Sequence, residues 1–355
     1  MERYIAVDSG KFSTKVATYD HEKNTTTWFK FRTMIDRGNF LDDALEANTF
    51  IVEYEGKTYK IGNGATREAA LETTKMSEIH KMTTLSAIAL LVEDGDEVNV
   101  CIGCPVKEYE VVEKRHEYKN YILPDGKITI KIKTKSEKPP ITKTFTIKSK
   151  YVYPESAGVL YLDMTRYNEA VCGVIDIGGA TALGTQYDNF ELLHDCSFSS
   201  ELGGNVLATK LSQDLSAEFS RCSVSYVRKV LLLPPDKRML VPKTPNPDIE
   251  KRSKEYITDY LINYVKDIKK YCDAKHWSLD YMDLAFVGGT SKIIQNEIKT
   301  VFGNNVYFPP NSEYTNVFGF LRRMCAKKLA LIIPETTDDK TKLTQSSKEN
   351  NKEVA

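Results

Sequence analysis

Two stretches of the sequence combine a carboxylate, glycines and hydroxyl groups at the end of an apolar run. One reads V-I-D-I-G-G-A-T over residues 174–181, so Asp176 is followed closely by Gly178 and Gly179. Glycine has no Cβ and lets the backbone approach a ligand closely. Bare N–H groups beside a carboxylate suit a phosphate and its metal ion, although the same residues also fit a plain hairpin turn.

The second stretch follows the same logic near the N-terminus. The apolar run of residues 4–7 leads into D-S-G-K-F-S-T-K, from Asp8 to Lys15, and a further β-like run follows over residues 16–19. We expect a β-hairpin whose turn offers an acid, Gly10, hydroxyls and cations. A strand rather than a helix follows, so this is not a Walker loop. Taken alone, the stretch also fits a solvated polar turn.

Two more glycine pairs stand at the ends of apolar or polar runs. L-A-F-V-G-G-T-S over residues 284–291 predicts a strand that ends in Gly288 and Gly289 before a helix. E-L-G-G-N over residues 201–205 opens another helix. Because the first N–H groups of a helix have no partner within it, the helix start at residues 201–205 tolerates an anion.

Glu155 lies in the segment Y-P-E-S-A-G, which we interpret as the end of a strand and the start of a helix. Proline in the first helical turn and an acid near the helix N-terminus are both favourable, which is one account of Pro154 and Glu155. The other account is a carboxylate that orients water near a phosphate.

The remaining pattern predicts the elements that must position these residues. Apolar residues recur at helical spacing over 77–93, and we expect His80 in that helix to be on the surface or lightly packed. Other expected elements are strands over 98–102, 127–133 and 144–147, helices over 109–121 and 249–272, and a last helix from residue 316. Residues 335–355 are polar and predict a disordered tail.

Composition narrows the function classes. The 355 residues include 49 Lys and Arg and 49 Asp and Glu, so no net charge draws the chain to nucleic acid or to an anionic membrane. The most basic stretch, residues 131–150, is a solvated sheet face or a contact surface for an acidic partner.

The seven cysteines are mostly dispersed, and we interpret Cys101 and Cys104 as buried thiols in a reducing cytosol. The N-terminus does not resemble a signal peptide, and we expect a cytoplasmic protein.

Taken together, these motifs resemble the actin fold superfamily. That family carries two phosphate hairpins, here Asp8–Lys15 and Asp176–Thr181, and an adenosine motif, here Phe286–Ser291. The resemblance implies an α/β fold of two related lobes, duplicated ribonuclease-H-like domains around a nucleotide cleft. We expect residues 1–160 to form the first lobe, with 318–334 packing back on it, and residues 161–317 to form the second.

The family assigns a role to each matching position. Asp8 and Asp176 would hold Mg²⁺ through water and act in catalysis, and Glu155 would position the attacking water. The residues expected to contact the nucleotide are Ser9, Gly10, Lys11, Lys15, Gly178, Gly179, Ala180, Thr181, Gly203, Gly204, Gly288, Gly289 and Thr290. Actin has a small hydroxyl residue where Lys11 stands, so this lysine either points outward or adds a second cation.

Within the superfamily, the sequence looks like the bacterial plasmid-segregation actins of the ParM type. The cues include residues 52–62, the Pro-Glu-Ser turn, Ile79–Lys81 and residues 316–320. This resemblance implies hydrolysis of ATP or GTP coupled to filament formation, and plasmid segregation through a ParR-like DNA-binding adaptor on a centromere-like site. It implies no direct contact with nucleic acid or membrane. The alternatives are a small-molecule kinase of the same superfamily and a non-polymerising actin-like adaptor.

Overall fold

The chain forms two compact units. The computed structural model describes residues 1–40, 45–69, 72, 74–135, 139–331 and 333, and the predicted tail over 335–355 lies outside them. Unit 1 consists of residues 1–155 together with the chain from residue 316, and unit 2 consists of residues 156–315.

Unit 1 is built on a ten-stranded sheet in the order β3-β2-β1-β8-β10-β9-β5-β6-β4-β7. Its strands are β1 (Glu2–Ser9), β2 (Ser13–Asp20), β3 (Thr25–Arg32), β4 (Met34–Arg37), β5 (Thr49–Tyr54), β6 (Lys57–Gly62), β7 (Arg67–Glu68), β8 (Glu97–Cys104), β9 (Lys127–Lys133) and β10 (Ile141–Pro154). Its helices are α1 (Glu78–Ala89), α2 (Val106–Glu110), α3 (Val112–Ile122) and α10 (Thr315–Leu329).

Three neighbouring strands of this sheet run parallel. β1 pairs with β8, with Val7 opposite Ile102, and β10 pairs with β8 on its other side, with Pro154 opposite Cys104. Parallel strands bring their carboxyl ends to the same edge of a sheet, which is where ligands bind in open α/β folds. Residues that follow or end these three strands are therefore neighbours, although they are far apart in the sequence.

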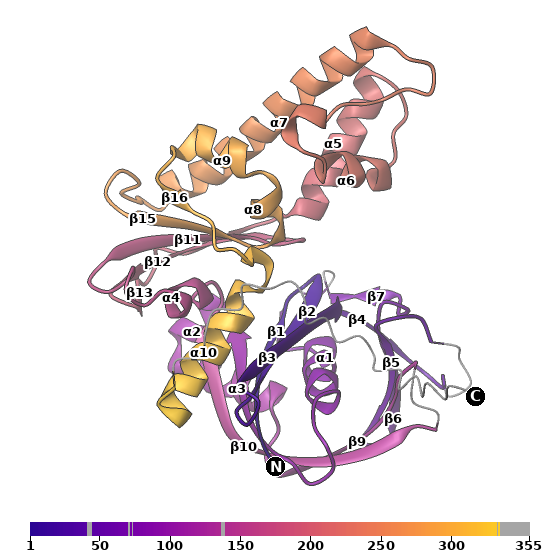
Figure 1. Cartoon of the computed structure of the whole chain (residues 1–355), viewed down its shortest axis with the longest axis vertical. Coiled ribbons are helices and arrows are strands. Elements are labelled where there is room, and N and C mark those ends of the chain that lie inside the picture. The colour runs from indigo at the N-terminus through magenta and orange to yellow at the C-terminus, as the bar shows by residue number, and fades with distance from the viewer. Residues whose placement is uncertain (41–44, 70–71, 73, 136–138, 332, 334–355) are drawn as a thin grey trace, which may run out of the picture. The chain divides into compact units, whose positions relative to one another are not determined.

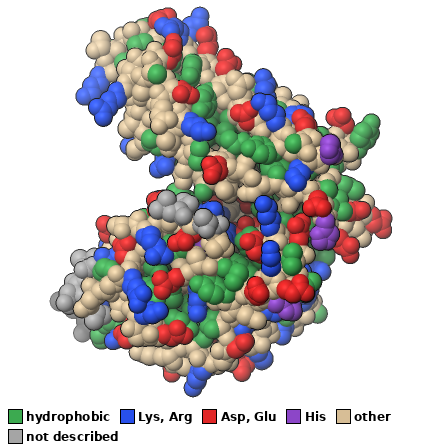
Figure 2. Space-filling view, turned by 180° about the vertical axis from the view of Figure 1, so that it is seen from behind, with side chains coloured by type: hydrophobic (Ala, Val, Ile, Leu, Met, Phe, Trp, Pro, Cys, Tyr) green, Lys and Arg blue, Asp and Glu red, His purple; other side chains and the backbone are tan. Residues whose placement is uncertain are grey.

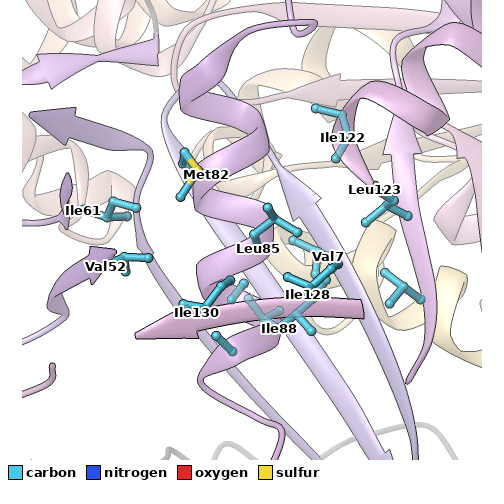
Figure 3. Close-up of a cluster of buried hydrophobic side chains, with 14 of the residues drawn as sticks. Val7, Val52, Ile61, Met82, Leu85, Ile88, Ile122, Leu123, Ile128 and Ile130 are labelled. Atoms are coloured by element: carbon cyan, nitrogen blue, oxygen red, sulfur yellow. The ribbon is translucent and has the colours of Figure 1, made fainter. Parts of the chain in front are cut away.

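Helix α1 lies inside the curve of this sheet, with strands around it (Figure 1). Its side chains Met82, Leu85 and Ile88 pack against apolar residues of the strands, among them Val52 and Ile130 (Figure 3). Ten of its twelve residues are buried. They include hydroxyl residues, which an amphipathic helix on the surface would expose to water. The helix over 77–93 is thus confirmed, with ends at Glu78 and Ala89.

The prediction for His80 is wrong. Its side chain is fully buried, because the sheet encloses α1 on more than one side. Helical spacing shows which residues share a face, but it does not show how many faces a neighbouring sheet covers.

The other expected elements of unit 1 need two corrections. The charged helix over 109–121 is two consecutive helices, α2 and α3, which meet at Val111. The strand expected over 144–147 belongs to the much longer β10, which has an irregular register between Ile147 and Ser149. Pro154 ends this strand instead of starting a helix, and Glu155 to Ala157 form a turn before the next helix.

Three lysines of the basic stretch over 131–150 pair with acids of unit 1. Lys131 pairs with Glu53 at 3.4 Å, and Lys148 pairs with Glu97 at 3.0 Å. Lys150 pairs with Asp125. On the face seen in Figure 2, basic and acidic side chains are interspersed within each unit. These pairs favour a solvated sheet face over a surface for an acidic partner.

Unit 2 is built on a six-stranded sheet in the order β13-β12-β11-β15-β16, with β14 also pairing with β12. Its strands are β11 (Val171–Ile177), β12 (Ala182–Asp188), β13 (Glu191–Leu192), β14 (Phe198–Ser200), β15 (Asp283–Val287) and β16 (Val306–Tyr307). Its helices are α4 (Gly158–Leu162), α5 (Gly204–Glu218), α6 (Val224–Leu231), α7 (Pro247–Ala274), α8 (Gly289–Ile293) and α9 (Gln295–Phe302).

The long helix α7 confirms the amphipathic helix expected over 249–272 and begins two residues earlier. Asn246 caps it by accepting a hydrogen bond from the backbone N–H of Ile249 at 3.2 Å, and Pro247 occupies its first turn. Its apolar face, which includes Ile257, Leu261 and Val265, is part of the core of unit 2. α7 and α9 lie on one face of the six-stranded sheet (Figure 1).

Candidate functional site

In unit 1, the predicted hairpin at Asp8 is present. β1 and β2 pair antiparallel with Asp8 opposite Lys15, and the backbone N–H of Gly10 donates to the carbonyl of Ser13 at 3.1 Å. Asp8 is 5% exposed, and one of its carboxylate oxygens lies 3.9 Å from Lys15 Nζ. The strand end therefore presents an acid and a cation beside a tight turn.

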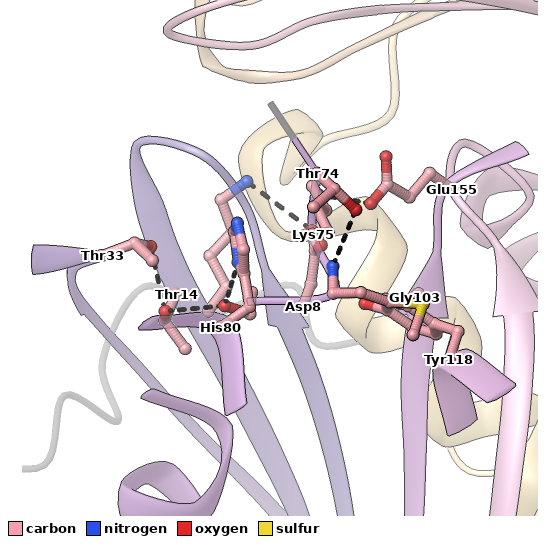
Figure 4. A network of polar contacts seen from close by, with 12 residues as sticks. Asp8, Thr14, Thr33, Thr74, Lys75, His80, Gly103, Tyr118 and Glu155 are labelled. Carbon is pink, nitrogen blue, oxygen red and sulfur yellow. Dashed lines mark hydrogen bonds and ion pairs between the residues drawn. The ribbon is translucent and has the colours of Figure 1, made fainter. Parts of the chain in front are cut away.

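The hydroxyl of Ser9 is held in a buried polar network under this hairpin. Ser9 Oγ lies 3.0 Å from His80 Nδ1, 3.0 Å from Thr83 Oγ1 and 3.4 Å from Thr14 Oγ1. Thr14 Oγ1 in turn lies 3.0 Å from Thr33 Oγ1 (Figure 4). Buried polar groups of this kind fix one another's orientation. The network thereby couples the hairpin to the start of α1.

His80 is neutral in this environment. Burial, together with the positive charges of Lys75 and Lys11, lowers the pKa of His80 to about 3. Lys11, one of these two cations, is half-buried.

The buried imidazole predicts a loss of stability in mild acid. The folded pKa is below the ordinary value of 6.5, so the unfolded chain binds more protons between pH 6.5 and about 3. The free energy of unfolding should therefore fall by about 2 kcal/mol from pH 7 to pH 5 through this group. We expect His80→Asn to remove this part of the pH dependence in denaturant titrations. His116→Asn, at an exposed site of the same unit, should keep it; equal pH slopes in both variants would contradict the prediction.

Glu155 lies at the same sheet edge as Asp8. Its backbone N–H donates to the carbonyl of Cys104 at 2.9 Å, which places it directly after the paired end of β10. Gly103 stands between the two acids: a Cβ there would lie 3.5 Å from Asp8 Oδ1 and 3.6 Å from Glu155 Cγ. Tyr118 donates a hydrogen bond to the carbonyl of Gly103 at 3.0 Å. Its pKa is raised by burial first and then by the negative charges of Glu155 and Asp8.

In unit 2, the predicted hairpin at Asp176 is also present. β11 and β12 pair antiparallel from Val171 to Ile177, and the N–H of Gly178 donates to the carbonyl of Thr181 at 3.0 Å across the turn. Asp176 is half-buried near the end of β11. The four residues 178–181 form the loop between the two strands, as expected.

The start of helix α5 packs directly on this loop. The backbone N–H groups of Gly204 and Asn205 donate to the carbonyls of Gly178 and Gly179 at 2.9 and 2.8 Å. A Cβ on Gly203 would lie 2.2 Å from the carbonyl carbon of Ala180 and 2.5 Å from the backbone nitrogen of Thr181. Glycine at position 203 is therefore required for loop and helix to touch.

The third glycine pair closes the same cluster. Gly288 has φ +90°, and a Cβ there would lie 2.4 Å from Asp176 Oδ1. Gly289 begins α8, and Thr290 Oγ1 donates to the carbonyl of Gly178 at 3.1 Å. The residues of unit 2 that the sequence predicted to contact the nucleotide or its metal thus lie in one cluster of backbone and carboxylate groups. They are Asp176 and residues 178–181, 203–204 and 288–290.

This packing predicts a large effect of one methyl group. Gly203→Ala should force the loop of residues 178–181 to move, because all the atoms that its Cβ would meet are backbone atoms. We expect a loss of about 1–3 kcal/mol in unfolding free energy and a weaker affinity for nucleotide, measured by denaturation and calorimetry. In Gly178→Ala, the new Cβ would meet nothing closer than 3.5 Å, so its stability should be nearly unchanged. Equal stabilities would contradict the prediction.

The residues present fit a phosphate with Mg²⁺ better than a metal held by protein alone. Among the described residues, no group of three or more His, Cys, Asp or Glu side chains could hold a metal ion. Mg²⁺ usually takes one or two carboxylates and fills its other positions with water and substrate phosphates. Asp8 and Asp176, each near the end of a strand and close to glycines, are compatible with that pattern.

Two residues of the site escaped the sequence analysis. Lys75 pairs with Glu155, and His80 with Ser9, although both partners are more than 70 residues away in sequence. A lysine before a helix and a histidine within it carry no local signal of such contacts. Only the tertiary fold, which brings His80 of α1 to the end of β1 and Lys75 to the residue after β10, could have revealed them.

Comparisons with known proteins agree with this geometry. The family model described as actin like proteins N terminal domain matches residues 6–158. The structure of an Alp12 filament is similar to the chain with a TM-score of 0.68 and 23% identity, over 92% of this chain and 99% of that one. The crystal structure of Ta0583, an archaeal actin homologue, gives a TM-score of 0.72 with 16% identity over the same shares of the two chains. The chain has an actin-like fold.

Further relatives of this actin-like chain include a ParM protein from Clostridium botulinum, solved as a 15-stranded filament. It has a TM-score of 0.65 and 17% identity, over 91% of this chain and 99% of that one. None of the curated proteins compared with the chain matches it. The comparisons confirm the α/β, two-unit actin-like architecture that the motifs predicted.

In the part of the chain that the structure describes, no helix is long and apolar enough to cross a membrane.

Proposed function

We propose that the chain binds ATP or GTP with Mg²⁺, hydrolyses it, and polymerises into filaments that segregate plasmid DNA through a DNA-bound adaptor. The observation that carries this proposal is the presence, in each unit, of a hairpin with an Asp at its strand end and a glycine-lined turn. The neighbours solved as Alp12 and ParM filaments support self-association, and Ta0583 was also solved in complex with ADP.

The phosphate contacts follow from backbone geometry. The hairpin of unit 1, from Ser9 to Lys15, would contact phosphate oxygens through its N–H groups and through the ammonium groups of Lys11 and Lys15. The loop of residues 178–181 would cradle the β- and γ-phosphates, with Gly203 and Gly204 close by at the N-terminus of α5. The partial positive charge of a helix N-terminus favours such an anion. Gly288, Gly289 and Thr290 would line the base and ribose.

The chemistry needs positioning and charge neutralisation more than covalent help. Mg²⁺, when bound, supplies charge neutralisation at the phosphates, and Asp8 and Asp176 would hold it through water. Glu155 would orient the attacking water and accept its proton as the water oxygen bonds to the γ-phosphorus. The leaving oxygen then departs with the nucleoside diphosphate.

The chain would form filaments in the cytoplasm. These filaments would move plasmid DNA, although the chain would not contact the DNA itself. A head-to-tail contact between identical chains is open-ended and gives a filament. A ParR-like adaptor bound to a centromere-like plasmid site would link filament and DNA. The balance of acids and bases over the chain gives no reason for direct binding to nucleic acid or membrane.

The test is assembly of the purified chain. With Mg²⁺ and ATP or GTP, we expect a rise in light scattering, pelletable filaments in micrographs, and release of inorganic phosphate. EDTA should abolish phosphate release and filament turnover. No polymer with either triphosphate would refute the filament function, and phosphate transfer to a sugar or acetate without polymer would instead identify a kinase.

A further inference from the structure

Lys75 and Glu155 form an ion pair at the edge of the sheet of unit 1, where β10 ends. Lys75 Nζ bonds to Glu155 Oε1, and their side chains are 11% and 17% exposed (Figure 4). Hydrogen bonds between ionised groups are about twice as strong as neutral ones, and partial burial reduces screening by water. The pair is therefore a firm restraint on the carboxylate.

The backbone that follows Lys75 is anchored. Met76 packs against the core of unit 1, and α1 begins at Glu78, whose carboxylate accepts a hydrogen bond from Tyr59 at 2.8 Å. These contacts hold the segment before α1 against the sheet. The ammonium of Lys75 thus comes from a fixed element, which lets it define where Glu155 points.

The carboxylate of Glu155 needs such a restraint. Its backbone is fixed by the hydrogen bond to Cys104, but a glutamate side chain has three rotatable bonds and loses considerable entropy when it is held in one rotamer. A displacement of about 1 Å in a catalytic group can cost about a hundredfold in rate. An unrestrained Glu155 would therefore spend little time in a geometry that orients water.

We propose that Lys75 is a positioning residue for hydrolysis, which holds Glu155 through Oε1 so that Oε2 meets the attacking water. This inference rests on the role of Glu155 in the proposed function. The proton taken from water goes to the Glu155 carboxylate, and Lys75 remains an ammonium throughout. A competing role for Lys75 is direct contact with the γ-phosphate, which would make it part of nucleotide binding.

Kinetics of three variants separate these roles. Lys75→Met should lower kcat for Mg²⁺-ATP or Mg²⁺-GTP by about tenfold to a hundredfold, while KM and the Kd for a non-hydrolysable analogue change less than about threefold. Lys75→Arg keeps the cation and should restore part of kcat. Lys81→Met removes a lysine of the same unit that lies over Tyr54 and Tyr121, and it should hydrolyse like the wild type.

A double-mutant cycle supplies a readout that a merely structural role would not change. In a Glu155→Gln background, Lys75→Met should lower kcat no further, because the group that it positions is gone. An undiminished kcat in Lys75→Met, additive effects in the cycle, or a loss of analogue affinity equal to the loss in kcat would each overturn the inference. Absence of hydrolysis by the wild type would instead remove the proposed function, and the inference with it.

Discussion

Replacing Asp176 with alanine is expected to lower kcat for nucleotide hydrolysis at least about a hundredfold, with little change in the free energy of unfolding. In the proposed function, this carboxylate holds Mg²⁺ through water, so its loss removes charge stabilisation from the transition state. The fold should survive, because the strand is held by backbone pairing of Asp176 with Leu183 and Val287, which alanine retains.

Phosphate release, measured at saturating Mg²⁺ and nucleotide, provides the test. Asp188→Ala is the matched control, since Asp188 ends the partner strand of the same hairpin and is exposed. The control should hydrolyse like the wild type. Turnover of Asp176→Ala at the wild-type rate would remove Asp176 from the catalytic site.

The second large effect concerns Glu155. Glu155→Gln keeps the shape of the side chain but removes the base, and general bases contribute about 10²–10⁴ to rate. We expect kcat to fall within that range, while addition of triphosphate still triggers assembly.

Light scattering and phosphate release followed in one sample separate the two events. Glu117→Gln removes an exposed acid from the same unit and should leave both signals unchanged. If Glu155→Gln abolished assembly together with hydrolysis, the carboxylate would be needed for nucleotide binding or folding, and its assignment to water would be wrong.

The predictions from the sequence were best for the short motifs that form turns at strand ends. The hairpins at Asp8 and Asp176 and the Gly288–Gly289 turn were all predicted with the right elements on both sides. Each combines an apolar run with glycine, the two hairpins add an acid, and each part of that pattern has a local physical cause. Local causes of this kind can be read without knowing the rest of the fold.

Contacts made across the sheet could not be predicted in this way. His80 was expected on the surface, because a single helix does not show that a curved sheet surrounds it. Pro154 was expected in the first turn of a helix, because proline and a following acid are favourable there, but it is the last residue of β10. Lys75 was missed because its partner Glu155 is distant in sequence. The parallel pairing of β1, β8 and β10 puts Glu155 at the sheet edge where Lys75 bonds to it.

The edge strands of the two sheets affect whether copies of the chain associate without nucleotide. Exposed strand edges invite uncontrolled strand addition between copies, which leads to aggregates. Here, in the described residues, three of the four edges are strands of only two or three residues, namely β7, β13 with β14, and β16. The longer edge, β3, carries Lys30 and Arg32. Amyloid-like growth is thus discouraged, and we expect the nucleotide-free protein to stay dispersed, which leaves self-association to side-chain surfaces.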